Sequence, residues 1–327
     1  MIPPAPRIAV IGAGIAGLSA AWLLRHHADV TLFEAAPRAG GHADTELVPG
    51  PAGPVPVDCG FIVFNEHTYP NLTALFAALK VESIATTMSF AVSVDGGALE
   101  YGGGSLGQIF AQPANLARPR FLAMLRDIPR FYRQVPMVLE GEDRGESLGA
   151  YLARNRYGEG FIEDHILPMG AAIWSGTLAG MEAFPVRHFA RFFANHGLLN
   201  LTRRPQWRSV AGGSRCYVAA MLGDLGARAR LSHRVVEVIR RPGASGVDLR
   251  FADGDVAEFD QVILACHADQ ALALIGAPHG SERAILGAMR FQDNDAVLHA
   301  DPALMPRRKR VWSAWNFLRD SSADRAG

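Results

Sequence analysis

The sequence predicts an α/β protein in which a parallel sheet with helices is interleaved with a second, α+β domain. The apolar run Arg7–Ile11 is followed by a glycine-rich turn and then by an apolar stretch with helical spacing. This order is typical of a buried strand, a turn and a helix in a parallel sheet. Another short apolar run, Phe259–Ala265, lies far along the chain. We therefore expect the sheet to be assembled from separate parts of the sequence.

Composition excludes several classes of protein. The chain has 327 residues, 49% of them hydrophobic and 20% charged, and its formal net charge is +0 at pH 7. These values are typical of a globular protein with a sizeable core, and zero net charge gives no general attraction to nucleic acid. Cys59, Cys216 and Cys266 are far apart and lack metal-ligand spacing. They predict a reduced, cytoplasmic setting with no disulfide framework and no metal site.

The apolar run Ile8–Leu24 could be mistaken for a signal peptide or a transmembrane segment. It contains three glycines at fixed spacing, no basic stretch precedes it, and no small-residue cleavage site follows it. It therefore predicts a buried strand and helix instead. No other stretch approaches membrane-spanning length, so we expect no transmembrane segment.

The turn Gly12–Gly17 reads GAGIAG. Each glycine has an expected mechanical role in a nucleotide-binding turn. Gly12 permits a tight turn, Gly14 lets the backbone approach a pyrophosphate, and Gly17 lets the helix pack closely on the sheet. The pyrophosphate would lie at the start of the helix, where unpaired N–H groups favour an anion.

The residues around this turn complete a Rossmann-type unit. Leu18–Leu24 has helical spacing, Val30–Phe33 is typical of a second strand, and Glu34 follows that strand. A carboxylate at this place accepts hydrogen bonds from the adenosine ribose. A glycine motif alone would be weak evidence, but the strand, helix, second strand and acid together predict a dinucleotide site.

NAD and FAD share this unit, so the residues that follow Glu34 must discriminate between them. The chain continues Ala-Ala-Pro-Arg-Ala-Gly-Gly-His over 35–42 and later reads Val-Asp-Cys-Gly over 57–60. This resembles the extended fingerprint of the glutathione-reductase-like FAD superfamily, in its amine oxidase and phytoene desaturase branch. The resemblance implies an FAD-binding domain whose cofactor-binding residues are Gly12, Ala13, Gly14, Ile15, Ala16, Gly17, Glu34, Ala35, Arg38, Gly40, Gly41, His42, Gly60 and, through its backbone, Val235.

His42 stands where this superfamily usually has an arginine. It is either a polar substitute or a covalent attachment point for the flavin.

The later sequence implies that the FAD-binding domain is discontinuous. After Ala211–Ser214 the pattern predicts a helix at Tyr217–Leu225, a strand at Ala229–Ile239, a hairpin beginning with Val247–Phe251, and the buried strand Phe259–Ala265. We expect the FAD-binding domain to comprise residues 1–80 and 205–275, and a substrate domain to comprise 81–204 and 276–327.

Two stretches of the expected substrate domain allow alternative interpretations. Leu106–Leu139 alternates apolar residues with arginines. It is either one or two cap helices with an apolar inner face, or a surface for an anionic or membrane-bound lipid substrate, with peripheral membrane contact. Pro168–Ser175 combines small residues with a tryptophan. It would suit either a wall beside the flavin or an ordinary buried turn.

From Arg7 to Phe317 the order of segments is similar to one bacterial family of amine-oxidase-like, predicted NAD/FAD-binding flavoproteins. The matching stretches include Gly60–Asn65, Arg191–Phe193, Ala211–Arg215 and Trp312–Asn316. Members of this family are linked to enzymes that modify unsaturated fatty acyl chains, which implies a hydrophobic substrate. Family chains continue beyond Asn316, so the resemblance also implies a C-terminally truncated chain that holds flavin weakly.

Many amine oxidases carry a lysine that holds a water molecule near the flavin. In the similar stretch of this chain, Asn294–Leu298, Asp295 occupies the lysine position. Asp295 is the one candidate for a catalytic residue: it would be a base if it were buried with a raised pKa, and otherwise an exposed loop residue.

These observations predict an FAD-dependent oxidoreductase. It would take a hydride from a C–C or C–N bond of a small hydrophobic substrate, such as a fatty-acyl compound, with flavin as the acceptor. Two alternatives stay open at this point: an NAD-dependent dehydrogenase, and a catalytically silent dinucleotide-binding protein.

Overall fold

The computed structural model describes residues 4–200, 204–241, 243 and 245–321. The chain forms two compact units, each assembled from separate segments. The first unit comprises Met1–Val63, Asn71–Ile84 and Ser209–Val297, and the second comprises Phe64–Pro70, Ala85–Arg208 and Leu298–Gly327. Among the described residues, no helix is both long enough and apolar enough to cross a membrane.

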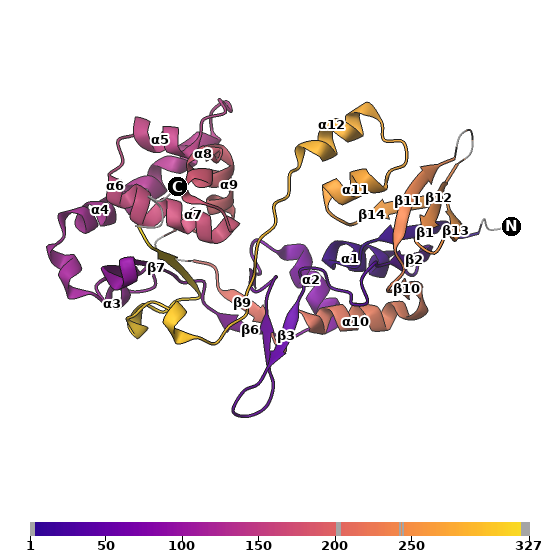
Figure 1. The fold of residues 1–327 in the computed structure, drawn as a ribbon, viewed down its shortest axis with the longest axis horizontal. Coiled ribbons are helices and arrows are strands. Elements are labelled where there is room, and N and C mark those ends of the chain that lie inside the picture. Colours follow the sequence, from indigo (N-terminus) through magenta and orange to yellow (C-terminus); the bar gives the residue numbers. More distant parts are fainter. Residues whose placement is uncertain (1–3, 201–203, 242, 244, 322–327) are drawn as a thin grey trace. The chain divides into compact units, whose positions relative to one another are not determined.

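A four-stranded parallel sheet forms the centre of the first unit (Figure 1). Its strands have the order β10 (Ala229–Arg230), β2 (Asp29–Phe33), β1 (Arg7–Ile11) and β14 (Gln261–Leu264). The central strand β1 is buried because helix α1 (Ile15–Leu24) packs on it and neighbouring strands cover both its edges. Helix α10 (Arg215–Leu225) packs in turn on α1. The α/β fold with a parallel sheet is therefore confirmed.

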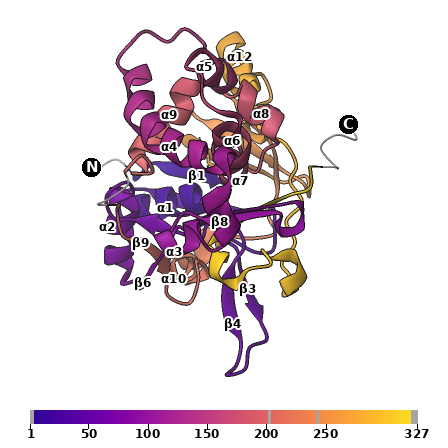
Figure 2. The same ribbon diagram turned by 90° about the vertical axis from the view of Figure 1, so that its left-hand side faces the viewer.

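The other elements of the first unit surround this sheet. An antiparallel hairpin of β3 (Thr45–Val48) and β4 (Val55–Asp58) extends away from the sheet in both Figures 1 and 2. Helix α2 (Pro70–Leu79) begins at the boundary of the two units. A second antiparallel sheet contains β11 (Val235–Arg240), β12 (Val247–Phe251) and β13 (Val256–Phe259).

Helices α11 (Ala268–Leu274) and α12 (Gly280–Ala288) pack against each other within the first unit. The sequence prediction had placed residues from 276 onward in the substrate domain. The functional division into domains remains a prediction.

Two predicted strands are each split in the structure. Ala229–Ile239 was expected to be one strand, but Ser232 adopts a positive φ of 54° and turns the chain. The residues before this turn join the parallel sheet as β10, and those after it join the antiparallel sheet as β11. Similarly, Phe259–Ala265 breaks at Asp260, whose carboxylate accepts a hydrogen bond of 2.7 Å from the amide of Arg7.

The second unit contains a small sheet and a group of helices. The sheet has the order β15 (Trp315–Arg319), β7 (Phe90–Val94) and β8 (Leu99–Gly102), with β15 parallel to β7 and β8 antiparallel to it. Three further short strands form another sheet at the points where the chain passes from one unit to the other: β5 (Phe64–Asn65), β6 (Ser83–Thr86) and β9 (Trp207–Val210). The helices are α3 (Leu106–Ile109), α4 (Pro119–Gln134), α5 (Leu148–Arg154), α6 (Glu159–Phe161), α7 (Leu167–Trp174), α8 (Leu178–Ala183) and α9 (Val186–Asn195).

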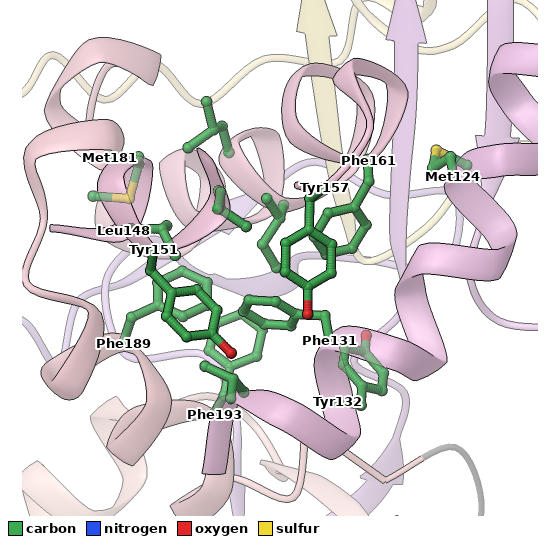
Figure 3. Close-up of a cluster of buried hydrophobic side chains, with 14 of the residues drawn as sticks. Met124, Phe131, Tyr132, Leu148, Tyr151, Tyr157, Phe161, Met181, Phe189 and Phe193 are labelled. Carbon is green, nitrogen blue, oxygen red and sulfur yellow. The ribbon is translucent and has the colours of Figure 1, made fainter. Parts of the chain in front are cut away.

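The helices of the second unit share an aromatic core. Figure 3 shows aromatic side chains from several helices gathered around Phe131 of α4. The Phe131 ring lies 5.3 Å from that of Phe161 and 6.2 Å from that of Phe189, and all three side chains are fully buried. Aromatic pairs at such distances add to the stabilisation that burial of their area provides.

The stretch Leu106–Leu139 contains the expected cap helix with an apolar inner face, α4, which buries Phe121, Met124 and Phe131. Its arginines are not simply solvated. Arg120 forms ion pairs with Glu159, Glu163 and Asp164.

Pro168–Ser175, interpreted as a wall or a turn, is mostly helix α7, which ends where Ser175 adopts a left-handed conformation. Helix α7 follows the π-helical turn Ile162–Ile166 without a break, and Pro168 has no N–H to offer the preceding turn. The Asp164 carbonyl instead accepts a hydrogen bond of 2.7 Å from the Tyr101 hydroxyl.

Candidate functional site

The glycine-rich turn of the first unit joins β1 to α1, and its three glycines meet different surroundings. Gly12 has a φ of +103°, and a Cβ on it would lie 2.6 Å from the carbonyl oxygen of Ala265. A Cβ on Gly17 would collide with the carbonyl oxygen of Gly12. A Cβ on Gly14 would meet nothing within 4 Å. Gly12 and Gly17 are therefore required by the fold itself, whereas the space beside Gly14 is open.

Helix α1 begins directly after this open position. No side chain in the described part of the chain caps the helix at Gly14, and the first turn contains no acidic residue. Ile15 and Ala16 are exposed, while Ala13 is fully buried. The first amides of a helix carry partial positive charge and need partners from outside the helix. This end of α1 can therefore accept an anionic group such as a pyrophosphate.

Glu34 lies directly after β2 and holds the glycine-rich turn in place. One carboxylate oxygen accepts a hydrogen bond of 2.7 Å from the amide of Ala13, and the other accepts one of 2.9 Å from the amide of Ala36. Ala35 lies between Glu34 and Ala36 in the sequence, and it is exposed. The carboxylate thus positions the turn as well as lying beside it, a role that the sequence did not reveal.

The Gly-Gly pair lies against the glycine-rich turn. Gly40 forms a parallel β-bridge with Gly14, and its amide donates a hydrogen bond of 2.8 Å to the carbonyl of Ala13. A Cβ on Gly41, where φ is +56°, would lie 3.2 Å from the Cα of Gly14. The structure therefore brings these two glycine motifs together.

Arg38 and His42 flank the Gly-Gly pair and have partners of their own. Arg38 forms an ion pair of 2.8 Å with Asp44 at the surface. The exposed His42 ring stacks on His267 with a centroid distance of 5.6 Å, and His267 stacks on Phe291 at 4.3 Å. His42 is thus part of an aromatic stack in the first unit.

Gly60 and Asp58 connect this region to helix α10. A Cβ on Gly60 would collide with the carbonyl oxygen of His42, so this close approach requires glycine. Asp58 accepts hydrogen bonds from the Ser214 amide at 2.8 Å, the Ser214 hydroxyl at 2.7 Å and the Thr45 hydroxyl at 2.6 Å. The sequence quoted Asp58 as part of a motif but did not predict its function of anchoring the start of α10.

Val235 begins β11 and is 6% exposed. It belongs to a core cluster that also contains Phe33 of β2. Two residues before Val235, the His233 amide donates a hydrogen bond of 2.8 Å to the carbonyl of Glu34, the residue that follows β2. The backbone of this segment therefore lies beside the end of β2.

Asp295 lies in the stretch 290–300, which has no regular secondary structure, and its side chain is exposed. This placement matches the exposed-loop interpretation of Asp295.

The second unit contains a cavity of about 140 Å³. Its lining is mostly apolar and includes Phe90, Leu125, Ile128, Met169, Ile173 and Trp315. His165 and Arg204 also reach it. Sequence reasoning did not single out these two residues, which come from segments separated widely along the chain.

Comparison with known proteins agrees with the geometry of the first unit. In a sequence comparison, residues 15–287 match the model of one family, flavin containing amine oxidoreductase. A curated relative, tryptophan 2-monooxygenase from Pantoea agglomerans pv. gypsophilae, is 42% identical over 83 residues, which are 25% of this chain and 12% of that protein.

Solved structures show the same fold. A variant of putrescine oxidase has a TM-score of 0.62 at 19% identity, over 86% of this chain and 63% of that chain. Cyclohexylamine oxidase from Brevibacterium oxydans has a TM-score of 0.61 at 18% identity, over 87% and 63%. A CLA-producing fatty acid isomerase from P. acnes has a TM-score of 0.59 at 17% identity, over 88% and 64%. The chain thus spans a little under two thirds of the length of these solved proteins.

The family match covers most of the chain, from the start of α1 to the end of α12. It confirms FAD as the cofactor that the sequence predicted, and the chain belongs to the flavin-containing amine oxidoreductases.

Proposed function

We propose that this chain is an FAD-dependent oxidoreductase that takes a hydride from a C–C or C–N bond of a hydrophobic substrate. The observation that carries the proposal is the open position of Gly14 between two glycines that the fold itself requires. Among the residues that the structure describes, none fills the space beside Gly14, and the close approach of a ligand explains a glycine there.

Each residue of this region has a proposed task. Residues 12–17 and the first amides of α1 hold the pyrophosphate, while Gly40 and Gly41 keep the backbone close to it. Glu34 accepts hydrogen bonds from the ribose and retains the turn through Ala13. Ala35, Arg38, His42, Gly60 and the backbone of Val235 complete the proposed cofactor contacts. When bound, FAD supplies the acceptor of the hydride.

We propose that the apolar cavity of the second unit holds the body of the substrate. Its mostly apolar lining supports a hydrophobic molecule over a highly charged one. Similar structures include a cyclohexylamine oxidase and a fatty acid isomerase, so a cyclic amine and an acyl chain are both reasonable classes to test. The proposal includes a cytoplasmic location, which the three free cysteines support.

The cofactor site can be tested by adding a side chain at Gly14. Gly14→Val should abolish FAD binding while the free energy of unfolding of the flavin-free protein stays within about 0.5 kcal/mol of wild type. The matched control is Gly223→Val, since Gly223 in α10 is exposed and equally open. FAD content is measured after denaturation and extraction. Normal FAD content in Gly14→Val would contradict the assignment of the site.

The activity can be tested by anaerobic mixing of flavin-loaded protein with cyclic amines and with unsaturated fatty acids. Reduction by a true substrate removes the visible absorbance of oxidised flavin. If dithionite reduces the bound flavin but no compound of either class does, the chain behaves as a silent dinucleotide-binding protein and the proposed activity is wrong.

A further inference from the structure

The cavity of the second unit has room for one apolar group of about the size of a ring. Its volume of about 140 Å³ is close to that of an engineered apolar cavity of about 150 Å³ that takes up benzene. Residues from α4, α7 and the β15–β7–β8 sheet provide most of the apolar lining. All the lining residues belong to the second unit, so the cavity lies within that unit.

Arg204 gives this lining a positive charge. Among the described residues that line the cavity, none is an aspartate or a glutamate, and the other titratable side chains are His165, Tyr101 and Tyr132. Burial lowers the pKa of His165 to about 4, so its ring is neutral at pH 7. Burial raises the pKa of both tyrosines, so their hydroxyls keep their protons. The lining therefore contains the charge of Arg204 without a compensating negative charge.

The charge of Arg204 acts on groups inside the cavity. It lowers the pKa of His165 further, and it opposes the rise in the pKa of Tyr132. These two side chains are 5% and 8% exposed, and both line the cavity. Arg204 itself is exposed. A ligand that enters from solvent can therefore contact the guanidinium while its apolar part occupies the cavity.

The guanidinium of Arg204 has hydrogen-bond donors available. In the described part of the chain its side chain makes one hydrogen bond, from Nε to the carbonyl of Asn200 at 2.8 Å. The two terminal amino groups are left to bind another acceptor. Asp164, which precedes His165, pairs instead with Arg120 at 2.8 Å. A guanidinium can bind a carboxylate through two parallel N–H···O bonds, which are stronger than hydrogen bonds between neutral groups.

A cation without a counter-charge beside an apolar cavity discriminates between ligands. It attracts an anion and repels an ammonium group, and a lining of low dielectric constant strengthens both effects. A small anion without an apolar body would leave the apolar lining unused. A molecule that joins an apolar body to a carboxylate matches both the lining and the charge.

We infer that the cavity binds an apolar carboxylate, whose body of about the size of one ring contacts the apolar side chains and whose carboxylate pairs with Arg204. That this molecule is also oxidised rests on the proposed function. That it binds does not, since the cavity and Arg204 both lie in the second unit.

Calorimetric titration of the flavin-loaded protein at pH 7 with four probes tests this binding. Benzoate has both the ring and the carboxylate, benzamide is its uncharged analogue, benzylammonium has the opposite charge, and acetate lacks the ring. Benzoate should bind about fivefold more tightly than benzamide, as expected for an ion pair at a site partly open to water. Benzylammonium should bind more weakly than benzamide, and acetate more weakly than benzoate by about tenfold.

Three results of these titrations would overturn the inference. They are equal affinities for benzoate and benzamide, tighter binding of benzylammonium or of acetate than of benzoate, and no binding of any probe. A higher salt concentration should weaken benzoate and leave benzamide unchanged, because salt screens the charge of an exposed guanidinium. An equal effect of salt on both probes would also count against the ion pair.

Arg204→Gln should bring the affinity for benzoate down to that for benzamide, while benzamide binds as before. Arg204→Lys keeps the charge without the planar pair of donors, so it should keep part of the preference. The matched control is Arg191→Gln, since Arg191 is exposed on α9 of the same unit and lies outside the cavity lining. A fivefold preference that persists in Arg204→Gln would contradict the assignment of Arg204.

Ile173→Phe shows whether binding takes place in the cavity, and it keeps the test informative if Arg204→Gln does not fold. The larger side chain at this lining position reduces the space, so benzoate and benzamide should both lose most of their affinity. If benzoate keeps its affinity in Ile173→Phe, the anion binds elsewhere and the inference is wrong.

Binding and activity can fail separately. Benzoate binding with the predicted preference, without flavin reduction by any apolar carboxylate or amine, would contradict the proposed function and support the binding site. Flavin reduction by a cyclic amine that benzoate does not inhibit would contradict the inference and support the proposed function.

Discussion

The two candidate sites of this protein differ in whether backbone or side chains form them. The cofactor region of the first unit is formed mainly by backbone: glycines at close approaches, helix amides, and one carboxylate that holds the turn. The cavity of the second unit is formed by side chains from a sheet and several helices, with one imidazole oriented by a tyrosine hydroxyl. Backbone gives the first site its anion-binding geometry, and the Glu34 carboxylate holds that backbone in place. Side chains give the second a shape and polarity that can change with one substitution.

The consequence is a difference in how mutations act. In the first site, substitution of Gly12 or Gly17 would disturb the fold as well as the site, whereas substitution of Gly14 would affect only the site. In the second, apolar residues contribute to the core of the unit, while His165 is a buried polar group whose cost must be offset by a partner.

Gly17→Ala should have the largest effect on stability. The added Cβ would collide with the carbonyl oxygen of Gly12, and backbone cannot move aside as a flexible side chain can. We expect a loss of about 3 kcal/mol in the free energy of unfolding, measured by urea denaturation. Gly14→Ala is the matched variant and should stay within about 0.5 kcal/mol of wild type. Equal stabilities of the two variants would contradict the assignment of Gly17 to close packing within the fold and of Gly14 to the approach of a ligand.

His165 should make stability depend on pH. Its pKa is about 4 in the folded protein and 6.5 in the unfolded one, so unfolding takes up a proton between these values. The free energy of unfolding is therefore highest, as far as His165 is concerned, above pH 6.5, and it decreases as the pH falls from 6.5 to about 4. This decrease in the free energy of unfolding amounts to about 3 kcal/mol.

Urea denaturation of wild type and His165→Leu at several pH values from 4 to 7 would measure this dependence. Tyr101 and Arg204 also face His165, but neither changes its charge in this range, because burial raises the pKa of Tyr101 further and arginine stays protonated. Parallel pH curves for the two proteins would show that His165 is not buried in a neutral form.

The contrast also explains what the sequence could predict. The strand Arg7–Ile11, the turn Gly12–Gly17 and the acid Glu34 lie within one short stretch, and their spacing alone implies the Rossmann unit. The same spacing predicted that Gly12 and Gly17 are needed for close packing, and the structure shows both close approaches. A local pattern was sufficient for the Rossmann unit because all its parts lie within one short stretch.

Features that depend on distant partners were not predictable in the same way. The strand expected at Ala229–Ile239 splits because Ser232 turns the chain toward a different partner strand, and no local pattern showed this. The cavity needs β7, α4, α7 and β15 together, so only the folded chain reveals it. His165 gave one weak local signal, a proline three residues later inside an apolar helical stretch.

Glu34→Ala should have an intermediate effect. It removes the proposed ribose contacts and the hydrogen bonds to the amides of Ala13 and Ala36. We expect FAD binding to weaken by about 1–3 kcal/mol, measured by fluorescence titration of the flavin-free protein. Glu34→Gln keeps one oxygen that can accept from Ala13 and should lose less. An unchanged dissociation constant in Glu34→Ala would remove Glu34 from the cofactor site.

The smallest effect should come from Asp295, the residue that occupies the position of the lysine in related oxidases. Its side chain is exposed and its segment has no regular secondary structure, so water screens its charge. Asp295→Lys should therefore leave the flavin reduction potential unchanged, because a cation stabilises the reduced, anionic flavin only at short range and low dielectric. The potential is measured by dye equilibration during slow reduction, with Asp293→Lys in the same exposed stretch as the control. A rise of about 30 mV in Asp295→Lys alone, equal to about 1.4 kcal/mol for a two-electron couple, would place Asp295 at the flavin and restore it as a catalytic candidate.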